Sequence, residues 1–343
     1  MVADPERPVV AADGEAPLVT IDAVRAAAAT LRGIATRTPL IPFGRPDERR
    51  VLKAESLQPI GAFKIRGAYV AVASLSREDR ARGVITYSSG NHAQGVARAA
   101  RLLGAPAVVV MPSDAPALKR ARVEADGAEV VVVGTSSEER QRVAEEIAAQ
   151  RGLAIVPPFD DDRIIAGQGT VGLEIAEELP DVAAVLVPIG GGGLASGIAV
   201  AIKALVPGAR VIGVEPELAA DARDSLRAGR VVRWPAEDVS RTIADGTRTT
   251  AIGLRNFAHL STLLDDVVTV SEEEIAAGVR VAAEESRLVA EPSGALSVAA
   301  MAFRSKEAGL AALDGPVVAV VSGGNVDPER YRGLLAAPLP ARG

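Results

Sequence analysis

Short apolar runs that alternate with helical segments constrain the fold of this chain more than any other feature. The runs are rich in Val and Ile and have the length of buried strands, and segments rich in Ala, Glu and Arg, such as residues 138–150 and 272–287, separate them. This alternation predicts βαβ units, in which parallel sheets are covered by helices on both faces. The predicted strands span residues 83–87, 107–111, 129–133, 184–188, 211–215 and 317–322.

The spacing of the runs predicts two α/β domains, each with three layers. A chain of 343 residues is long enough for two domains of roughly 150 residues each. The first three predicted strands follow one another closely, as expected for a small sheet of their own. We expect a small domain at residues 83–160, inserted into a large domain of residues 17–82 and 161–343, with a flexible tail at residues 1–16.

Composition excludes several classes of function. The net charge of −6 and the pI of about 5.3 argue against a nucleic-acid binder, which usually has a basic patch. The chain has no Cys and two His, so neither disulfides nor a zinc site with three or four Cys or His ligands is expected. No apolar run reaches the roughly 18 residues of a membrane span, and the N-terminus lacks the apolar stretch of a signal peptide. We therefore expect a soluble cytoplasmic protein without nucleic-acid or membrane partners.

One lysine has the surroundings of a reactive amine. Lys64 lies between the apolar Phe63 and a predicted helix, in the segment ESLQPIGAFKIRGAY at residues 55–69. The chain has 38 basic residues, but only five of them are lysines. Arginine cannot form an imine because its guanidinium stays protonated, so a lysine is expected where an amine is required. A surface lysine beside a helix is the alternative interpretation.

A small polar turn follows the first predicted strand. Ser88, Ser89, Gly90 and Asn91 connect this strand to a helical pattern. Such a turn presents backbone N–H groups at a helix N-terminus, which suits a carboxylate or a phosphate. The same residue types are also favoured as ordinary helix caps, and His92 alone is more often a structural histidine.

Two glycine-rich turns follow later strands. The four glycines at residues 190–193 lie between a strand and a helix, where a flexible linker is not expected, and they fit neither a Walker loop nor a dinucleotide motif. We interpret them as a phosphate cup, because glycine lets the backbone approach an anion closely. Ser322 ends the last predicted strand, and its hydroxyl can form one hydrogen bond with a ring nitrogen. Together with Lys64, these turns indicate a phosphorylated aldehyde cofactor.

In their order along the chain, these motifs resemble the serine/threonine dehydratase and serine racemase family. This family belongs to the tryptophan-synthase-like, fold type II group of pyridoxal-phosphate enzymes, so the resemblance implies two parallel-sheet, three-layer domains. It extends from about Thr20 to Asn325. The motifs that carry it lie at residues 61–68, 88–97, 166–170 (AGQGT), 190–197, 214–221, 242–246 (TIADG), 288–295 (LVAEPSGA) and 322–325.

The resemblance implies a set of cofactor-binding residues. Lys64 corresponds to the Schiff-base lysine, Asn91 to the partner of the cofactor's phenolic oxygen and Ser322 to the partner of its pyridine nitrogen. Phe63 corresponds to the residue that packs near the cofactor ring, Glu291 to a residue close to that ring, and residues 190–194 to the phosphate loop. The full set is Phe63, Lys64, Asn91, Gly190, Gly191, Gly192, Gly193, Leu194, Glu291 and Ser322.

The resemblance also implies substrate and cation sites. Ser89 corresponds to the acid–base group that serves the opposite face of the substrate in racemases, which makes it a second catalytic candidate beside Lys64. The substrate carboxylate is expected at Ser88, Ser89, Asn91 and His92, and a divalent cation (Mg²⁺, Ca²⁺ or Mn²⁺) at Glu215, the carbonyl of Ala219 and Asp221.

The expected activity is dehydration of a small β-hydroxy amino acid, such as L-threonine or L-serine, to a 2-oxo acid and ammonia. An amino-acid racemase, a dehydratase of hydroxyaspartate or phenylserine, and a noncatalytic phosphate- or nucleotide-binding regulator are the alternatives. We also expect a homodimer. The family usually has T-G-S-F-K where this chain has I-G-A-F-K, so Ile60 and Ala62 are expected to line the substrate side and favour a bulkier or less polar β-substituent.

Overall fold

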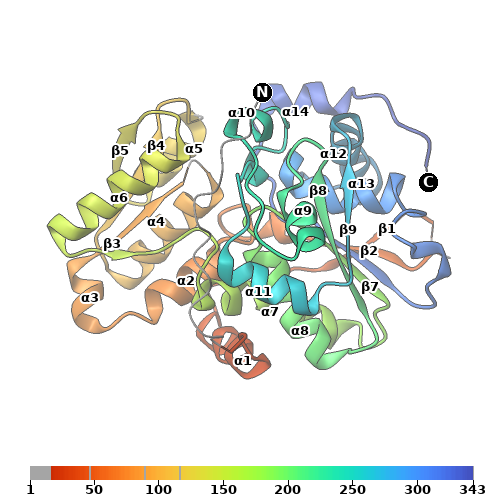
Figure 1. Ribbon diagram of the computed structural model, residues 1–343, viewed down its shortest axis with the longest axis horizontal. Coiled ribbons are helices and arrows are strands. Elements are labelled where there is room, and N and C mark those ends of the chain that lie inside the picture. The colour runs from red at the N-terminus through yellow and green to blue at the C-terminus, as the bar shows by residue number, and fades with distance from the viewer. Residues whose placement is uncertain (1–16, 46–47, 89, 116, 343) are drawn as a thin grey trace.

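Two parallel sheets with helices on both faces make up the computed structural model, which describes residues 17–45, 48–88, 90–115 and 117–342 (Figure 1). The large sheet has the strand order β1-β2-β10-β7-β8-β9, and the small sheet has the order β5-β4-β3-β6. All neighbouring strands in the described residues are parallel except β1 and β2. The large-sheet strands are β1 (Leu40–Phe43), β2 (Arg50–Lys53), β7 (Ala184–Pro188), β8 (Arg210–Pro216), β9 (Asp266–Val270) and β10 (Val317–Val320).

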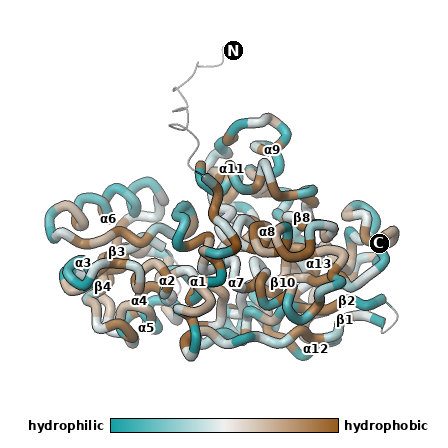
Figure 2. The backbone as a smooth tube through the Cα atoms, turned by 90° about the horizontal axis from the view of Figure 1, so that it is seen from below, coloured by the Kyte–Doolittle hydropathy of each residue, from teal (hydrophilic) through white to brown (hydrophobic). Residues whose placement is uncertain are grey.

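The large sheet is buried because its strands are apolar on both faces. Leu186 and Val214 pack with α12 and α13 on one face, and Val185 and Val187 pack with α7 and α8 on the other. Figure 2 shows hydrophobic residues concentrated at β8 and α8 and hydrophilic residues along α6. The helices of the two faces are α7 (Asp162–Glu178), α8 (Gly193–Leu205), α12 (Glu272–Ser286) and α13 (Leu296–Phe303).

The small sheet repeats this three-layer arrangement. Val109 and Met111 pack with α4 and α5 on one face, whereas Val108 and Val110 pack with α6 on the other. The elements are β3 (Val84–Tyr87), β4 (Ala107–Pro112), β5 (Glu129–Val133), β6 (Ala154–Ile155), α4 (Asn91–Leu103), α5 (Ala117–Ala125) and α6 (Ser137–Arg151).

Helix α2 (Ile65–Ala73) connects the two layered units, since it packs against both α4 and α7. Ala68 and Val72 share an apolar cluster with the small sheet, so the predicted domain boundary at residue 82 stays a prediction. The remaining elements are α1 (Ile21–Thr30), η2 (Glu55–Leu57), α3 (Arg77–Arg82), α9 (Asp221–Ala228), α10 (Ala236–Val239), η3 (Asp245–Thr247), α11 (Leu254–Leu263), η4 (Pro292–Ala295), η5 (Leu310–Ala312) and α14 (Pro328–Leu335).

The predicted α/β class and the six predicted strands are confirmed, with small differences at the strand ends. Strands β1, β2, β6 and β9 were not predicted. The predicted tail at residues 1–16 lies outside the described residues. Among the residues that the structure describes, no helix has the length and apolar character needed to cross a membrane.

Candidate active site

A cavity of about 570 Å³ brings together residues from both sheets. Ser89 lies outside the described residues. Ile60 and Ala62 are buried but do not line the cavity, so the expected apolar lining on the substrate side is wrong. The predicted residues that do line it are Phe63, Lys64, Ser88, Asn91, His92, Gly190, Gly191, Gly192, Gly193, Leu194, Glu291 and Ser322.

Lys64 projects into this cavity from the start of α2, where it occupies the N-cap position. Its Nζ donates a hydrogen bond to the carbonyl of Pro158 at 2.7 Å and lies 5.1 Å from the centre of the Phe63 ring. Burial lowers the pKa of Lys64 to about 8, because a charged ammonium is disfavoured away from water. A larger share of this side chain is therefore the nucleophilic free amine at neutral pH than for an ordinary lysine.

The glycine loop forms the N-terminus of α8, directly after β7. Gly192 is the N-cap and has a φ of 99°, a conformation that favours glycine. The first N–H groups of a helix have no partner within the helix, so they can bind an anion. The side chain of Asn256 supports the loop by donating hydrogen bonds to the carbonyls of Gly191 at 2.9 Å and Phe159 at 3.2 Å.

Asn91 and Glu291 form a polar pair at the cavity wall. The Asn91 side chain donates to Glu291 Oε1 at 2.5 Å and accepts a hydrogen bond from Asn325 Nδ2 at 2.8 Å. Burial raises the pKa of Glu291 to about 7. Glu291 can therefore hold a proton near neutral pH, unlike an ordinary carboxyl group.

His92 lines the cavity as an uncharged side chain. Burial, together with the nearby positive charge of Lys64, lowers its pKa to about 3. Its Nε2 lies 3.1 Å from the carbonyl of Val156, which identifies Nε2 as the protonated nitrogen. Its buried Nδ1 has no hydrogen-bond partner among the described residues, so it is available as an acceptor.

Residues 31–323 match the family described as pyridoxal-phosphate dependent enzyme. This chain belongs to that family. The assignment confirms the predicted family and makes the chain an enzyme whose cofactor is pyridoxal phosphate. It disfavours the noncatalytic regulator that the glycine turns alone left open.

The relatives of this pyridoxal-phosphate enzyme differ in activity. The L-threo-3-hydroxyaspartate ammonia-lyase of Saccharomyces cerevisiae is 43% identical over 83% of this chain and 85% of its own length. The serine racemase of Schizosaccharomyces pombe is 38% identical over 93% of this chain and 98% of its own length. The solved structure of a threonine deaminase from T.th. has a TM-score of 0.82 and 43% identity, and the match covers 90% of this chain and 99% of that one. These similarities confirm the predicted fold type.

Several polar residues that line or support the cavity were missed in the sequence. Lys119 of α5 and Asp245 of η3 form an ion pair of 2.7 Å that joins the small-sheet side to the large-sheet side, and both residues line the cavity. Lys119 is one of only five lysines, and Asp245 lies in the TIADG motif, so both carried a signal. No sequence pattern pointed to Asn256, because the loop that it supports lies more than 60 residues away in the sequence.

The predicted cation ligands lie outside the cofactor cavity, at the carboxyl end of β8. Glu215 is buried and accepts hydrogen bonds from the N–H groups of Ala222 at 3.0 Å and Arg223 at 2.8 Å. Both carboxylate oxygens of Asp221 are buried, and neither has a hydrogen-bond partner among the residues that the structure describes. Burial raises the pKa of Asp221 to about 7, and burial together with the Asp221 charge raises that of Glu215.

Proposed function

We propose that this enzyme removes water from a small β-hydroxy amino acid and releases ammonia and a 2-oxo acid. The observation that carries this proposal is the half-buried Lys64 amine, with its pKa lowered to about 8, in the same cavity as the glycine loop at the N-terminus of α8. The two relatives named as an ammonia-lyase and a threonine deaminase support it. Bound pyridoxal phosphate supplies the electron sink for this chemistry.

The residues of the cavity fit this cofactor. Lys64 offers an amine for its aldehyde, the N-terminus of α8 offers N–H groups for its phosphate, and Ser322 offers a hydroxyl for its ring nitrogen. A neutral serine leaves that nitrogen largely unprotonated, which favours elimination over transamination, where an Asp partner is expected. Phe63 and Glu291 also line the cavity, where Phe63 would pack near the ring and Glu291 would lie close to it.

Lys64 also serves as the base in this proposal. A lysine with a lowered pKa can take the proton from the substrate's α-carbon and hold it at Nζ. The turn before α4 offers backbone N–H groups and the side chains of Ser88 and Asn91 for the substrate carboxylate. His92 is uncharged and its available Nδ1 is an acceptor, so its side chain offers a carboxylate neither an ionic contact nor a hydrogen bond.

Three arginines favour a substrate with an acidic β-substituent. Arg140, Arg233 and Arg248 line the cavity, and Arg140 extends from α6, at the same carboxyl edge of the small sheet as the turn before α4. Guanidinium groups bind carboxylates with paired hydrogen bonds. We therefore expect kcat/KM for L-threo-3-hydroxyaspartate to exceed that for L-threonine, and Arg140→Gln to lower the former by on the order of 10-fold while changing the latter little.

A substrate screen tests the proposed function. Purified enzyme is incubated with L-serine, L-threonine, L-threo-3-hydroxyaspartate and L-threo-phenylserine, and both ammonia and 2-oxo acid are measured. We expect equal amounts of the two products from at least one substrate and none with Lys64→Ala. Inversion at the α-carbon without ammonia release would identify a racemase instead.

Racemisation remains the competing activity, because the Schizosaccharomyces pombe relative is named serine racemase. Lys64 reaches one face of the substrate, so racemisation needs a second proton donor on the other face. Ser89, which the sequence predicts for this role, lies outside the described residues. Chiral analysis of the recovered amino acid therefore decides the balance, and Ser89→Ala is expected to remove inversion selectively.

We also propose that Glu215, the Ala219 carbonyl and Asp221 hold a divalent cation. Two carboxylates and a carbonyl are hard oxygen ligands of the kind that Mg²⁺ and Ca²⁺ prefer. The two buried Asp221 oxygens support this, because within the described part of the chain they have no hydrogen-bond partner and buried polar atoms are usually paired. Among the described residues, no group of three or more His, Cys, Asp or Glu side chains suits a metal ion, so the carbonyl is a necessary ligand.

The homodimer and the cytoplasmic location stay predictions. Light scattering coupled to size-exclusion chromatography of the cofactor-loaded enzyme measures the first. The net charge of −6 continues to argue against a nucleic-acid partner.

A further inference from the structure

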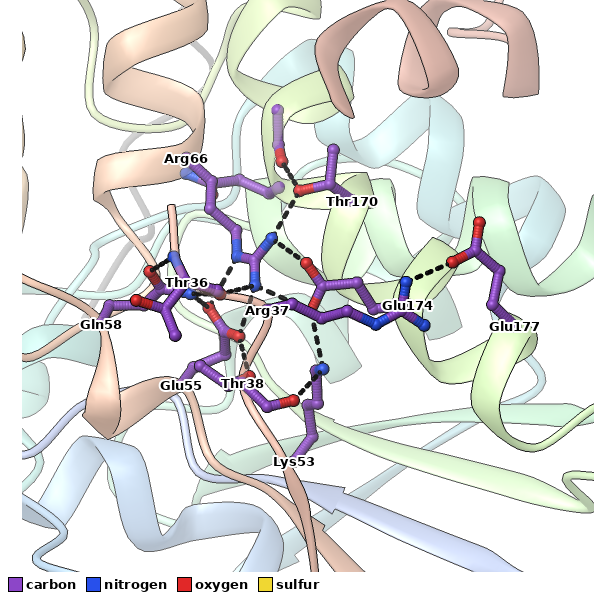
Figure 3. Close-up of polar contacts among 12 residues, drawn as sticks. Thr36, Arg37, Thr38, Lys53, Glu55, Gln58, Arg66, Thr170, Glu174 and Glu177 are labelled. Carbon is purple, nitrogen blue, oxygen red and sulfur yellow. Dashed lines mark hydrogen bonds and ion pairs between the residues drawn. The ribbon is translucent and has the colours of Figure 1, made fainter. Parts of the chain in front are cut away.

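A buried ion network centres on Arg66, which follows Lys64 by two residues in the chain (Figure 3). The side chain of Arg66 is 1% exposed. Its guanidinium donates hydrogen bonds to Glu55 at 2.8 Å and to Glu174 at 2.7 and 3.0 Å. It also donates to Thr170 Oγ1 and to the carbonyl of Thr36, both at 3.1 Å. Every nitrogen of the guanidinium therefore has an acceptor.

The network is charge-balanced within itself. Glu55 is fully buried and also accepts a hydrogen bond from Thr38 Oγ1 at 2.6 Å. Lys53 is fully buried as well, and its Nζ lies 2.7 Å from Glu174. Two cations thus face two carboxylates (Figure 3). Such a cluster adds little stability, because an apolar core of the same shape is often as stable. We therefore ascribe to it a role in fixing the geometry of the elements that it joins.

The network fixes the start of α2. Arg66 lies in the first turn of this helix, two residues after Lys64, whereas Glu55 belongs to η2, directly after β2, and Glu174 belongs to α7. A guanidinium that donates in several fixed directions holds these three elements in one arrangement.

Close backbone packing restrains α2 from its other sides. A methyl group added at Gly95 of α4 would lie 3.1 Å from the carbonyl oxygen of Lys64. One added at Gly167 of α7 would lie 2.6 Å from the Cα of Gly67. The backbone of Lys64 therefore lies between α4 and the ion network, with little room to shift.

We propose that Arg66 is a positioning residue for Lys64. It sets the direction in which the Lys64 side chain leaves the first turn of α2, and hence where Nζ meets the cofactor. This inference rests on Lys64 being the lysine that binds the cofactor. A positioning role would explain why these charges are buried despite their desolvation cost. A displacement of about 1 Å at a reacting group can lower the rate on the order of 100-fold.

The test replaces Arg66 with lysine in the cofactor-loaded enzyme. Arg66→Lys keeps the charge but loses the planar fork, so it cannot bind both carboxylates and both other acceptors. We expect kcat to fall on the order of 10- to 100-fold, with a much smaller change in KM. We also expect a smaller visible circular dichroism per bound cofactor, because this signal reports how the cofactor is held against its lysine.

Arg304→Lys is the matched control. Arg304 also bridges two carboxylates, Glu274 at 2.7 Å and Glu217 at 3.1 Å, but it lies at the C-terminal end of α13 and not in α2, the helix that carries Lys64. The control is expected to keep kcat and the visible signal, whatever its melting temperature. If Arg66→Lys does not fold, Glu55→Gln replaces it, since this change keeps the side-chain shape and removes one of the charges that Arg66 binds.

Two results would overturn the proposal. The first is an Arg66→Lys or Glu55→Gln enzyme that melts earlier but keeps the wild-type kcat and visible signal, which would make the network purely structural. The second is an equal loss in the Arg304→Lys control. The circular dichroism needs no substrate, so it tests the positioning role even if the proposed dehydration fails.

Discussion

Glu291 is a buried carboxyl group of the cavity, and its protonation near neutral pH makes the free energy of unfolding depend on pH. Its pKa rises from 4.5 to about 7 in the folded protein because of burial. Between these values the folded protein holds a proton that the unfolded chain releases, so the free energy of unfolding falls as pH rises through this window. Below this window the carboxyl group is protonated in both states and does not lower the free energy of unfolding. Above the window it lowers that free energy by the full amount.

Replacement of Glu291 by glutamine removes this dependence. Between about pH 4.5 and 7, the free energy of unfolding of Glu291→Gln is expected to fall less steeply with pH than that of the wild type. The two slopes should differ by on the order of 1 kcal/mol per pH unit. Urea unfolding across this range measures it. Glu329→Gln serves as the control, because Glu329 is 78% exposed. Parallel profiles of wild type and Glu291→Gln would show that the carboxyl group is ionised throughout.

Single residues of the site were predictable where their chemistry is unusual in the sequence. A lysine in an arginine-rich chain can be recognised from the sequence alone, and so can four consecutive glycines. Paired residues were not predictable, because the partners of Asn256 and Lys119 are brought together only by the tertiary fold. The proposed role of Ile60 and Ala62 failed for the same reason, since the sequence does not show which side of a turn faces the cavity.

At the scale of elements, the turn between β7 and α8 depends on the absence of side chains. A Cβ at Gly191 would collide with the ring of Phe159. Gly191→Val should therefore displace the loop and weaken cofactor binding by on the order of 10-fold or more, as expected for the loss of phosphate contacts. Equilibrium dialysis or absorbance titration of the folded variant measures this.

Gly208→Ala is the control for the loop, because a Cβ there meets no atom within 4 Å. It should bind the cofactor like the wild type. Unchanged cofactor affinity in a folded Gly191→Val enzyme would mean that the phosphate is held elsewhere.

The turn between β8 and α9 gives a prediction about metal removal. Without a cation, the raised pKa values of Glu215 and Asp221 favour protonation, and a bound cation would displace that proton. Chelator is therefore expected to lower the melting temperature at pH 8, and added Mg²⁺ or Ca²⁺ to restore it. The variant Glu215→Gln with Asp221→Asn should not respond to either. No response from wild type, and no metal by elemental analysis, would contradict the site.

Elements were predictable where burial is complete. Strands β7, β8 and β10 are apolar on both faces and stand out as continuous runs. Strands β1 and β2 were missed because they are short and include Pro42, Arg50 and Lys53, which look like loop residues. Lys53 is nevertheless fully buried, and its ion pair with Glu174 depends on the packing of α7, which no local pattern reveals.

At the scale of the whole molecule, the two sheets meet across the cavity through α5. Lys119 pairs with Asp245 at 2.7 Å, and Arg122 donates a hydrogen bond to Asn325, which in turn donates to Asn91. Both contacts join the small-sheet side to loops of the large-sheet side. The cavity is therefore closed in part by polar contacts rather than by an apolar interface.

The Lys119–Asp245 pair gives the last prediction. Burial raises the pKa of Asp245, but the charge and hydrogen bond of Lys119, together with the charges of Arg330 and Arg248, outweigh burial and leave this pKa lowered. Lys119→Met is expected to leave Asp245 without its partner, loosen the contact across the cavity and speed cofactor release by on the order of 10-fold, as for a partly buried pair that loses one member. Transfer of the cofactor to an excess of scavenging apoenzyme measures the release rate.

A double-mutant cycle separates the contact itself from the cost of an unpaired carboxylate. The release rate is measured for Lys119→Met, for Asp245→Asn and for both changes together, and a coupling of at least about 0.5 kcal/mol is expected for residues in direct contact. Lys203→Met is the control, because Lys203 pairs with Asp265 at 2.7 Å at the far end of α8, and neither residue lines the cavity. Additive effects in the cycle, or equally fast release from the control, would mean that the pair does not hold the two sheets together around the cofactor.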